Sequence, residues 1–378
     1  MLSRNFLLLW IGALAFSSSF QSLLTALPLY AQSLGARESE IGLIIGLFAT
    51  AAMVVRLPIG WQLDRGRRVS ILVAGAAIFA VSSAGYGVVG SVAGLLALRV
   101  FHGTGMAAFT TAGQTLAVDV APQGRRGEAL GVYAVANTLA SGLAPAAGMA
   151  LALAAGFTAL FAASSALGVV AVVLCALVAD PSPSPRVRRP GRLFNAAVVM
   201  PGLSLLALMF TYGAVASFVP LLALQRGLAN PGLFFSVYAM AMVAAQAIAG
   251  PASDRFGRAV VIAPGLALTA VGLVAMATLD GWWLLAAGVV YGLGAGATQP
   301  ALFASASDLV RPEQRGSAMA TMGLFLELGI GSGAIVAGVL AGSLGLGATF
   351  AGVAVVPLVG LALAMSAGQA RRSRLQPE

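Results

Sequence analysis

Long apolar stretches fill most of this sequence, and only short polar segments separate them. Each of twelve stretches contains about the 20 residues that a helix needs to cross a bilayer. The pattern therefore predicts twelve membrane-spanning helices. The first six are expected over Phe6–Leu29, Ile41–Gln62, Val69–Val88, Val92–Leu116, Glu128–Leu151 and Phe157–Ala179. The second six are expected over Ala196–Leu222, Gly232–Ala252, Ala259–Leu279, Trp282–Phe303, Ser317–Ala341 and Gly347–Ser366.

The longest polar break, DPSPSPRVRRPGR, lies in the middle of the chain from Asp180 to Arg192. Its prolines and arginines disfavour a helix and are typical of a linker. The sequence therefore predicts an all-α membrane protein built from two six-helix bundles. We expect an N-terminal bundle over residues 1–179, a cytoplasmic linker over 180–192 and a C-terminal bundle over 193–378.

The two halves repeat one another at a nearly constant spacing. GWQLDRGRR, from Gly60, resembles GPASDRFGR, which starts about 190 residues later at Gly250. VFHGTG and VVYGLG repeat at the same spacing, as do DVAPQGRRG, from Asp119, and DLVRPEQRG, from Asp308. Three matches at one spacing indicate a duplicated half. Duplicated half-bundles are typical of secondary transporters, in which the substrate site lies between the halves near the middle of the membrane.

Composition and charge support this reading. Hydrophobic residues make up 59% of the chain and charged residues 9%, whereas a soluble domain carries about 25% charged residues. All basic residues are arginines, and most lie in alternate loops, which is the topogenic pattern of a membrane protein and not a nucleic-acid patch. The positive-inside rule places both termini in the cytoplasm of a bacterium, with the chain in its inner membrane. The arginines expected inside are Arg4, Arg65, Arg67, Arg68, Arg125, Arg126, Arg186, Arg188, Arg189, Arg192, Arg255, Arg258, Arg311, Arg315, Arg371, Arg372 and Arg374, and those expected outside are Arg37 and Arg226.

The repeated loop motif resembles that of the major facilitator superfamily, G-x-x-x-D-R-x-G-R-R. The second copy fits at Gly250, Asp254, Arg255, Gly257 and Arg258. The first copy, with Gly60, Asp64, Arg65, Gly66, Arg67 and Arg68, is one residue shorter, so either Arg67 or Arg68 could take the role of the last arginine. The R-x-x-x-G-x-G pattern of the family's fourth helix is present at Arg99, Gly103 and Gly105.

The resemblance implies roles for the acidic residues of these loops. Asp64 would lie at the N-terminus of the Ser317 helix and Asp254 at that of the Glu128 helix, where a helix dipole stabilises a carboxylate. Asp119 and Asp308 would then pair with the loop arginines. The alternative is that these charges are only solvated and topogenic.

The fifth expected span resembles the pattern of the family's proton-coupled drug and metabolite efflux antiporters. Gly131, Pro145 and Gly148 fit it, while Ala140, Ala144 and Met149 replace its other glycines. We expect efflux by antiport on this basis. The alternative is ordinary helix packing through small residues.

Three formal charges lie well inside expected spans, and such charges are usually functional or paired. At 1.5 Å per residue, Glu327 and Arg56 are roughly 21 and 22 Å from the outer ends of their helices, while Arg99 is only about 10 Å deep. Helices two and eleven face each other in the family, so Arg56 and Glu327 are the expected pair. Protonation of Glu327 would open this gate. The alternative is a permanent structural pair.

Polar residues on the family's cavity helices form the expected substrate site. In the first span they follow one helical face, and further candidates lie on the fourth, seventh and tenth spans. They are Ser18, Gln21, Ser22, Thr25, Arg99, His102, Thr211, Tyr212, Ser217, Tyr291 and Gln299. His102 is either a proton carrier or a hydrogen-bonded cavity residue, and the polar face of the first span could instead join helices. Because none of these helices carries an acid in its cavity portion, we expect a neutral, amphipathic or anionic substrate, with Arg99 as a possible counter-charge.

The sequence contains no nucleotide-binding motif, metal-ligand cluster or hydrolase nucleophile motif, so we expect a transporter and not an enzyme. We expect no cofactor and no nucleic-acid partner. The expected partners are a small solute, the lipid bilayer and protons, whose gradient would supply the energy, and the expected state is a monomer. A proton-coupled symporter or a uniporter for uptake remains an alternative. A membrane sensor built on a transporter fold is another.

Overall fold

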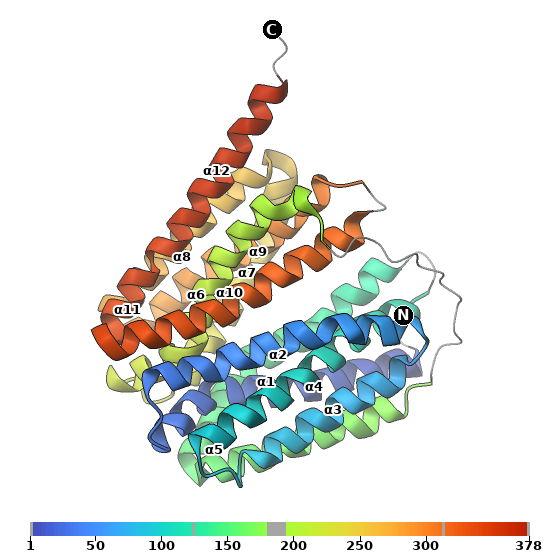
Figure 1. Cartoon of the computed structure of the whole chain (residues 1–378), viewed down its shortest axis with the longest axis vertical. Coiled ribbons are helices and arrows are strands. Elements are labelled where there is room, and N and C mark those ends of the chain that lie inside the picture. Colours follow the sequence, from blue (N-terminus) through green and yellow to red (C-terminus); the bar gives the residue numbers. More distant parts are fainter. Residues whose placement is uncertain (1–2, 123–124, 180–193, 312–313, 376–378) are drawn as a thin grey trace. The chain divides into compact units, whose positions relative to one another are not determined.

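The computed structural model describes residues 3–122, 125–179, 194–311 and 314–375, without the side chains of Leu57, Asp64 and residues 366–375. All regular elements in these ranges are helical (Figure 1). The first half contains α1 Arg4–Ser33, α2 Glu38–Asp64, α3 Arg68–Gly85, α4 Val92–Asp119 and α5 Arg126–Ala176. The second contains η1 Ala196–Val198, α6 Val199–Gln225, α7 Gly232–Phe256, α8 Arg258–Thr278, α9 Trp283–Asp308, α10 Arg315–Leu344, α11 Leu346–Val353 and α12 Val355–Leu375.

Ten helical segments of the described residues are long and apolar enough to cross a membrane. One of them, α5, is 51 residues long and contains two of the expected spans. A further helix, α9, is not among the ten, although its 26 residues exceed the length needed. The expectation of an all-helical membrane protein is confirmed.

A glycine interrupts the helix at the same place in each half. Gly156 has φ 84° and divides α5 into two segments. Gly345, 189 residues later, has φ 78° and separates α10 from α11. Only glycine adopts this region of φ at little cost. The repeat seen in the sequence therefore includes the turn between the last two spans of each half.

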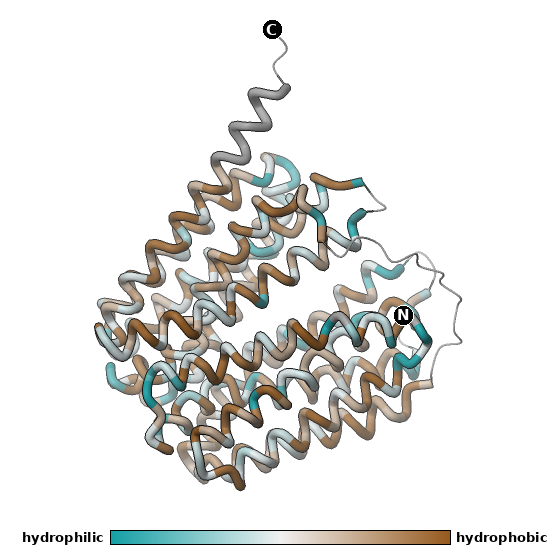
Figure 2. The backbone as a smooth tube through the Cα atoms, in the orientation of Figure 1, coloured by the Kyte–Doolittle hydropathy of each residue, from teal (hydrophilic) through white to brown (hydrophobic). Residues whose placement is uncertain are grey.

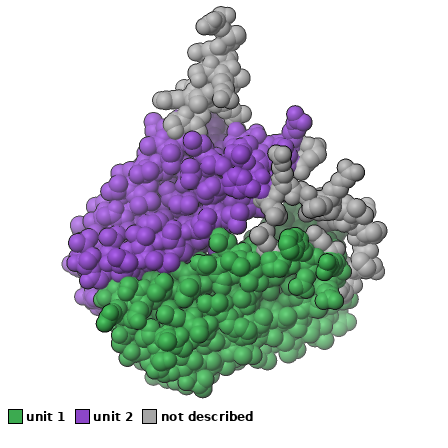
Figure 3. Space-filling view, in the orientation of Figure 1, with its two compact units in different colours: residues 1–188, 230–236 green, residues 189–229, 237–378 purple. Residues whose placement is uncertain are grey.

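The chain forms two compact units (Figure 3). Unit 1 comprises residues 1–188 together with 230–236, and unit 2 comprises residues 189–229 and 237–378. The first residues of α7 thus pack in unit 1, while the rest of the helix belongs to unit 2. The predicted linker, residues 180–192, lies outside the described residues, so the boundaries of the two predicted bundles stay a prediction.

Within each unit, glycines bring corresponding helices into close contact. A Cβ added to Gly103 in α4 would lie 2.5 Å from the carbonyl oxygen of Phe48 in α2. In unit 2, a Cβ added to Gly292 in α9 would lie 2.5 Å from the carbonyl oxygen of Tyr238 in α7. Gly292 follows Gly103, and Tyr238 follows Phe48, by about 190 residues along the chain. Small residues permit this close approach between membrane helices, so the internal repeat extends to the packing of side chains.

One of the two arginines expected outside has a structural role in unit 2. Arg226 follows α6 and donates hydrogen bonds to the carbonyl oxygens of Leu279, at 2.7 Å, and Ala277, at 2.6 Å. It also lies 3.2 Å from a carboxylate oxygen of Asp280. These carbonyls lie at the end of α8, where the last carbonyl groups of a helix have no N–H group of the same helix to accept from. Arg226 therefore fastens the connection after α6 to the end of α8.

Hydrophobic residues predominate along most of the length of the helices, and hydrophilic residues are more frequent near the helix ends (Figure 2). Large apolar side chains such as Val88, Ile248 and Leu143 are 86%, 74% and 70% exposed. Side chains of this kind would be costly on a water-facing surface in such numbers but are stable against lipid.

Candidate functional site

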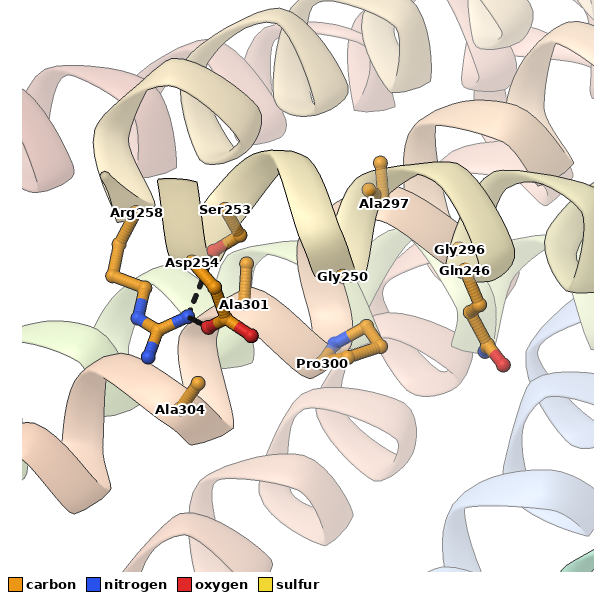
Figure 4. Close-up of a pocket in the computed structure, with 11 residues that line it drawn as sticks. Gln246, Gly250, Ser253, Asp254, Arg258, Gly296, Ala297, Pro300, Ala301 and Ala304 are labelled. Atoms are coloured by element: carbon orange, nitrogen blue, oxygen red, sulfur yellow. Dashed lines mark hydrogen bonds and ion pairs between the residues drawn. The ribbon is translucent and has the colours of Figure 1, made fainter. Parts of the chain in front are cut away.

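The second copy of the loop motif forms a network of charged side chains where α7 ends (Figure 4). The Arg258 Nε group donates to Asp308 Oδ2 at 2.9 Å, and its Nη1 group donates to Ser253 Oγ at 3.1 Å and to Asp254 Oδ1. The hydrogen bonds with Asp308 and Asp254 raise the pKa of the Arg258 guanidinium. The network joins the end of α7, the start of α8 and the end of α9. Arg255 lies outside it, with its guanidinium 5.3 Å from the ring centre of Phe256.

The first copy of the motif makes the matching contact with Arg68. Arg68 Nε lies 3.1 Å from Asp119 Oδ2, and both side chains are only 9% exposed. Arg67 and Arg65 are exposed. Arg68 and Asp119 therefore make the contact that corresponds to Arg258 and Asp308 in the other half. This contact favours Arg68 over Arg67 as the last arginine of the motif, whose role stays a prediction. The side chain of Asp64 lies outside the described residues, and Gly60 has no neighbouring atom within 4 Å of an added Cβ.

A pocket of about 170 Å³ lies between α7 and α9, next to the Arg258 network (Figure 4). Gln246, Ser253 and Asp254 contribute polar groups to its lining, and Gly250 and Pro300 also line it. Because Pro300 has no N–H group, the Gly296 carbonyl lacks its usual helical donor. The cavity therefore contains several hydrogen-bond acceptors at the ends of α7 and α9.

Arg99 and His102 lie together in the core of unit 1, where they are 2% and 0% exposed. Arg99 Nε donates to the Ile44 carbonyl at 2.9 Å, and its guanidinium lies 4.1 Å from the ring centre of Phe48. His102 Nδ1 lies 2.8 Å from the Tyr86 hydroxyl and 3.5 Å from Arg99 Nη1. Because arginine can only donate, Nδ1 acts as an acceptor, and the neutral His102 carries its proton on Nε2. Roles for both residues in a cavity or in coupling stay predictions.

The polar face of α1 is largely engaged in contacts with α5. Gln21 Nε2 donates to Ser141 Oγ at 2.5 Å. Ser22 donates to the Ser19 carbonyl at 2.9 Å and packs against Gly148, where an added Cβ would lie 2.7 Å from the Ser22 Cβ. Thr25 is 0% exposed, and Ser18 is half-buried. This arrangement favours the helix-joining reading for Gln21 and Ser22.

The residues of the antiporter-like motif lie on one helix but in different surroundings. Pro145 and Gly148 are buried, and the Pro145 carbonyl is in close contact with Gly232. Asn230 Nδ2 donates to the neighbouring Ala146 carbonyl at 3.0 Å. Gly131 is exposed, with no atom within 4 Å of an added Cβ. The inner part of the motif therefore packs α5 against α1 and against the start of α7.

In unit 2, the polar candidates of the seventh and tenth expected spans separate into buried and accessible residues. Tyr291, Thr211 and Ser217 are 0% exposed. Tyr212 and Gln299 are half-buried. A residue not anticipated from the sequence, Tyr238 in α7, has its ring 6.1 Å from that of Tyr212 and 5.6 Å from that of Tyr291. Tyr238 aligns with Phe48 in the internal repeat, and this alignment is the sequence signal that could have identified it.

The profile of the Major Facilitator Superfamily matches residues 9–234 and 202–377, which together cover nearly the whole chain. The chain belongs to the major facilitator superfamily. This membership confirms the family that the loop motifs resemble and the all-α fold of two related six-helix bundles. It also identifies a multi-pass membrane protein of a transporter family and not an enzyme.

This member of the major facilitator superfamily is similar to several curated proteins. It is 32% identical over 173 residues to an uncharacterized MFS-type transporter of Methanocaldococcus jannaschii, across 46% of this chain and 45% of the relative. It is 26% identical over 264 residues to the staphylopine export protein of Staphylococcus aureus, across 64% of each chain. The chain thus matches about half to two thirds of the length of these relatives.

Solved structures of transporters share its fold. A bacterial homolog of the human lysosomal transporter Spinster, in an inward-facing and occupied conformation, has a TM-score of 0.81 and 16% identity over 96% of both chains. The nucleoside transporter NupG has a TM-score of 0.81 and 13% identity over 95% of this chain and 99% of its own. At these identities the likeness concerns the fold alone.

The two deepest charges of this superfamily member lie in different units. Arg56 belongs to α2 in unit 1 and Glu327 to α10 in unit 2, and both are half-buried. Each unit is described by itself, so the pairing of Arg56 with Glu327 stays a prediction. Among the described residues, no group of three or more His, Cys, Asp and Glu side chains could hold a metal ion.

Proposed function

We propose that this chain is a secondary active transporter that exports a small solute in exchange for protons. The solute is neutral, amphipathic or anionic, and the proton gradient is the energy source. The protein works as a monomer in a bacterial inner membrane, with both termini in the cytoplasm. Alternating access of the two units would move the solute, as is general for transporters built from two repeats.

The observation that carries this proposal is the position of Glu327. It is the only acid deep inside an expected span, and the other residues of α10 between Arg315 and Leu344 carry no acid. Its side chain is half-buried, so the carboxyl lies in an apolar helix and is not enclosed on all sides within its unit. A carboxyl that exchanges protons between two sides of a membrane needs both properties.

Two further features support export by antiport. The chain is similar to a staphylopine export protein over 264 residues. Pro145 and Gly148, which fit the antiporter-like pattern, pack tightly against neighbouring helices. Together these features favour export over uptake.

The charge of the substrate is proposed from the helices that would line the cavity. In the described residues, α1 and α6 contain no acid, while the acids of α4 and α9 are their last residues, Asp119 and Asp308. A cationic substrate would lack a partner on these helices. The accessible side chains Ser18, Tyr212 and Gln299 suit a neutral or hydrogen-bonding solute.

The test is proton movement in proteoliposomes that contain the pH-sensitive dye pyranine. A panel of neutral, anionic and cationic compounds is added outside. An antiporter exchanges entering solute for internal protons, so the lumen becomes more alkaline. A symporter acidifies the lumen, and a uniporter leaves its pH unchanged.

Glu327→Gln is the decisive variant because glutamine resembles the protonated carboxyl. We expect it to abolish proton movement while passive exchange of solute continues. Liposomes without protein serve as the control. Unchanged pyranine signals with Glu327→Gln would contradict the proposed role of this carboxyl.

A further inference from the structure

We infer that Tyr212 and Tyr238 form a subsite in unit 2 for a flat, uncharged ring that carries hydrogen-bonding groups. We call this pair the tyrosine shelf. The inference rests on the proposed transport function, since it specifies part of the substrate. It adds a residue, Tyr238, on a helix that the sequence did not assign to the cavity.

Three of the chain's six tyrosines meet in unit 2. The rings of Tyr212, from α6, and Tyr238, from α7, are stacked at 6.1 Å with an angle of 29° between their planes. The Tyr238 ring is also 5.6 Å from the Tyr291 ring, from α9. Offset aromatic pairs at such distances attract one another beyond the effect of burial. The shelf is therefore built from three helices.

Tyr291 packs its ring against Tyr238 and has a hydrogen-bonded hydroxyl. Its ring is 0% exposed. Its hydroxyl lies 2.9 Å from Thr211 Oγ1, which itself lies 2.6 Å from the Leu208 carbonyl. The Thr211 proton is thus used on Leu208, so Tyr291 donates and Thr211 accepts. A ring held in this way is a rigid support for Tyr238.

The position of Tyr238 is fixed by the backbone as well. Gly292 brings α9 so near that an added Cβ would lie 2.5 Å from the Tyr238 carbonyl oxygen. A rigid aromatic surface loses little conformational freedom when it binds a ligand, which favours affinity. The two rings of the tyrosine shelf are therefore already in position before a ligand binds.

Tyr212 and Tyr238 differ from Tyr291 in their exposure and in their hydrogen bonding. Both are half-buried, and in the part of the chain that the structure describes neither hydroxyl has a hydrogen-bond partner. Each hydroxyl can donate one hydrogen bond and accept others. The shelf thus combines accessible ring surface with two unused polar groups, which suits a flat ring with hydroxyl, amide or ring-nitrogen substituents.

Phe48, which corresponds to Tyr238 in the internal repeat, has different chemistry around it in unit 1. Phe20 of α1 and Phe48 of α2 are stacked there at 5.6 Å, with an angle of 12° between their planes. These rings have no hydroxyls, and the Arg99 guanidinium lies over Phe48. Of these two stacked pairs, only the one in unit 2 carries hydroxyl groups. This difference points to unit 2 as the side that recognises an uncharged ring.

The test compares 2-naphthol with its saturated counterpart decahydro-2-naphthol. Binding to the detergent-solubilised full chain is measured by equilibrium dialysis. Both probes carry a hydroxyl, so they differ in ring stacking alone. Because stacking corresponds to an affinity difference of about two- to tenfold, wild type should prefer 2-naphthol by about that factor. Tyr238→Leu should remove the preference. Tyr238→Phe should weaken 2-naphthol binding about two- to tenfold and leave naphthalene binding unchanged.

Tyr133→Phe is the matched control, since it removes a tyrosine hydroxyl from α5 in the other unit. It should bind both probes as wild type does. Equal affinity of wild type for both probes, or an unchanged preference in Tyr238→Leu, would overturn the tyrosine shelf. If Tyr238→Leu does not fold, Tyr238→Phe with 2-naphthol and naphthalene decides. Binding by the shelf without proton movement in proteoliposomes would refute the proposed transport instead.

Discussion

At the scale of single residues, the contacts of an arginine show whether it has a structural role in addition to its effect on membrane orientation. The distribution of arginines predicts orientation, and it places Arg226 on the side where arginines are expected to be rare. Its hydrogen bonds to two carbonyls at the end of α8 give the reason. An arginine can appear on the disfavoured side of a membrane protein when a helix end needs its donors.

Arg226→Gln should lower the free energy of unfolding by about 2 kcal/mol, because two charge-assisted hydrogen bonds to carbonyls are lost. The measurement is the midpoint of thermal denaturation in detergent. Arg37→Gln is the matched control, since Arg37 is the other outer arginine and is exposed. Equal destabilisation by both variants would contradict this role of Arg226.

The shortened first copy of the loop motif gives a second prediction for single residues. Arg68→Gln should destabilise the protein by roughly 3 kcal/mol, because it removes the cation of a largely buried ion pair. Arg67→Gln should change stability by less than about 0.5 kcal/mol, because Arg67 is exposed. Thermal denaturation of both variants tests this. A larger effect from Arg67→Gln would reverse the assignment of the two arginines.

The sequence predicts which residues share a helix face better than it predicts what that face contacts. Arg99 and His102 are three residues apart, a spacing that puts them on one helix face, and the structure shows them close together. Their burial against Ile44, Phe48 and Tyr86 could not be predicted, because it depends on how α2 and α3 pack on α4. Tyr238 was missed for the same reason. Its ring is brought to Tyr212 by the close approach at Gly292, which no local pattern reveals.

At the scale of helices, the apolar stretches locate the spans well but not their ends. The predicted first span, Phe6–Leu29, lies inside the longer α1, because polar residues at either end also continue the helix. The predicted fifth and sixth spans are both present in α5, and only Gly156 divides them. Backbone continuity through such a short break cannot be read from hydrophobicity alone.

Gly156→Ala should destabilise the protein by about 1–2 kcal/mol, because a Cβ is unfavourable at φ 84°. Gly131→Ala is the control within the same helix. Gly131 lies in open space, so alanine there should be neutral or stabilise by about 0.5–1 kcal/mol. Denaturation midpoints of the two variants should therefore move in opposite directions or differ clearly. Similar midpoints would show that the break at Gly156 does not need glycine.

At the scale of the molecule, the arginine asymmetry predicts the orientation of the whole chain. Cysteines introduced at Ser184 and Ser39 should react with a membrane-impermeant maleimide from opposite sides. The background reactivity is removed with Cys175→Ala, since Cys175 is the single cysteine and is buried. Intact cells should label Ser39→Cys, and inverted vesicles should label Ser184→Cys. Reaction of both from one side would refute the topology.

The expected Arg56 and Glu327 pair is tested by a double-mutant cycle. Arg56→Gln or Glu327→Gln alone should cost roughly 3–5 kcal/mol, because each leaves a charge in the membrane without its partner. The double variant should cost less than the sum. Free energies of unfolding in detergent supply the four corners of the cycle. Additive effects would mean that the two charges do not interact, and Arg99 or His102 would become the next partner to test for Glu327.

The matching contacts of Gly103 with Phe48 and of Gly292 with Tyr238 have a consequence for ancestry. A contact that occurs twice at one spacing was present before the gene was duplicated, so the ancestral half already packed its second helix against its fourth. What diverged afterwards was the chemistry beside the contact. His102 stands in one copy and Tyr291 in the other, and Phe48 corresponds to Tyr238. We infer that the two copies diverged in function after the duplication. The first copy kept the charge of Arg99 in its core, whereas the second copy acquired tyrosine rings that bind a ligand.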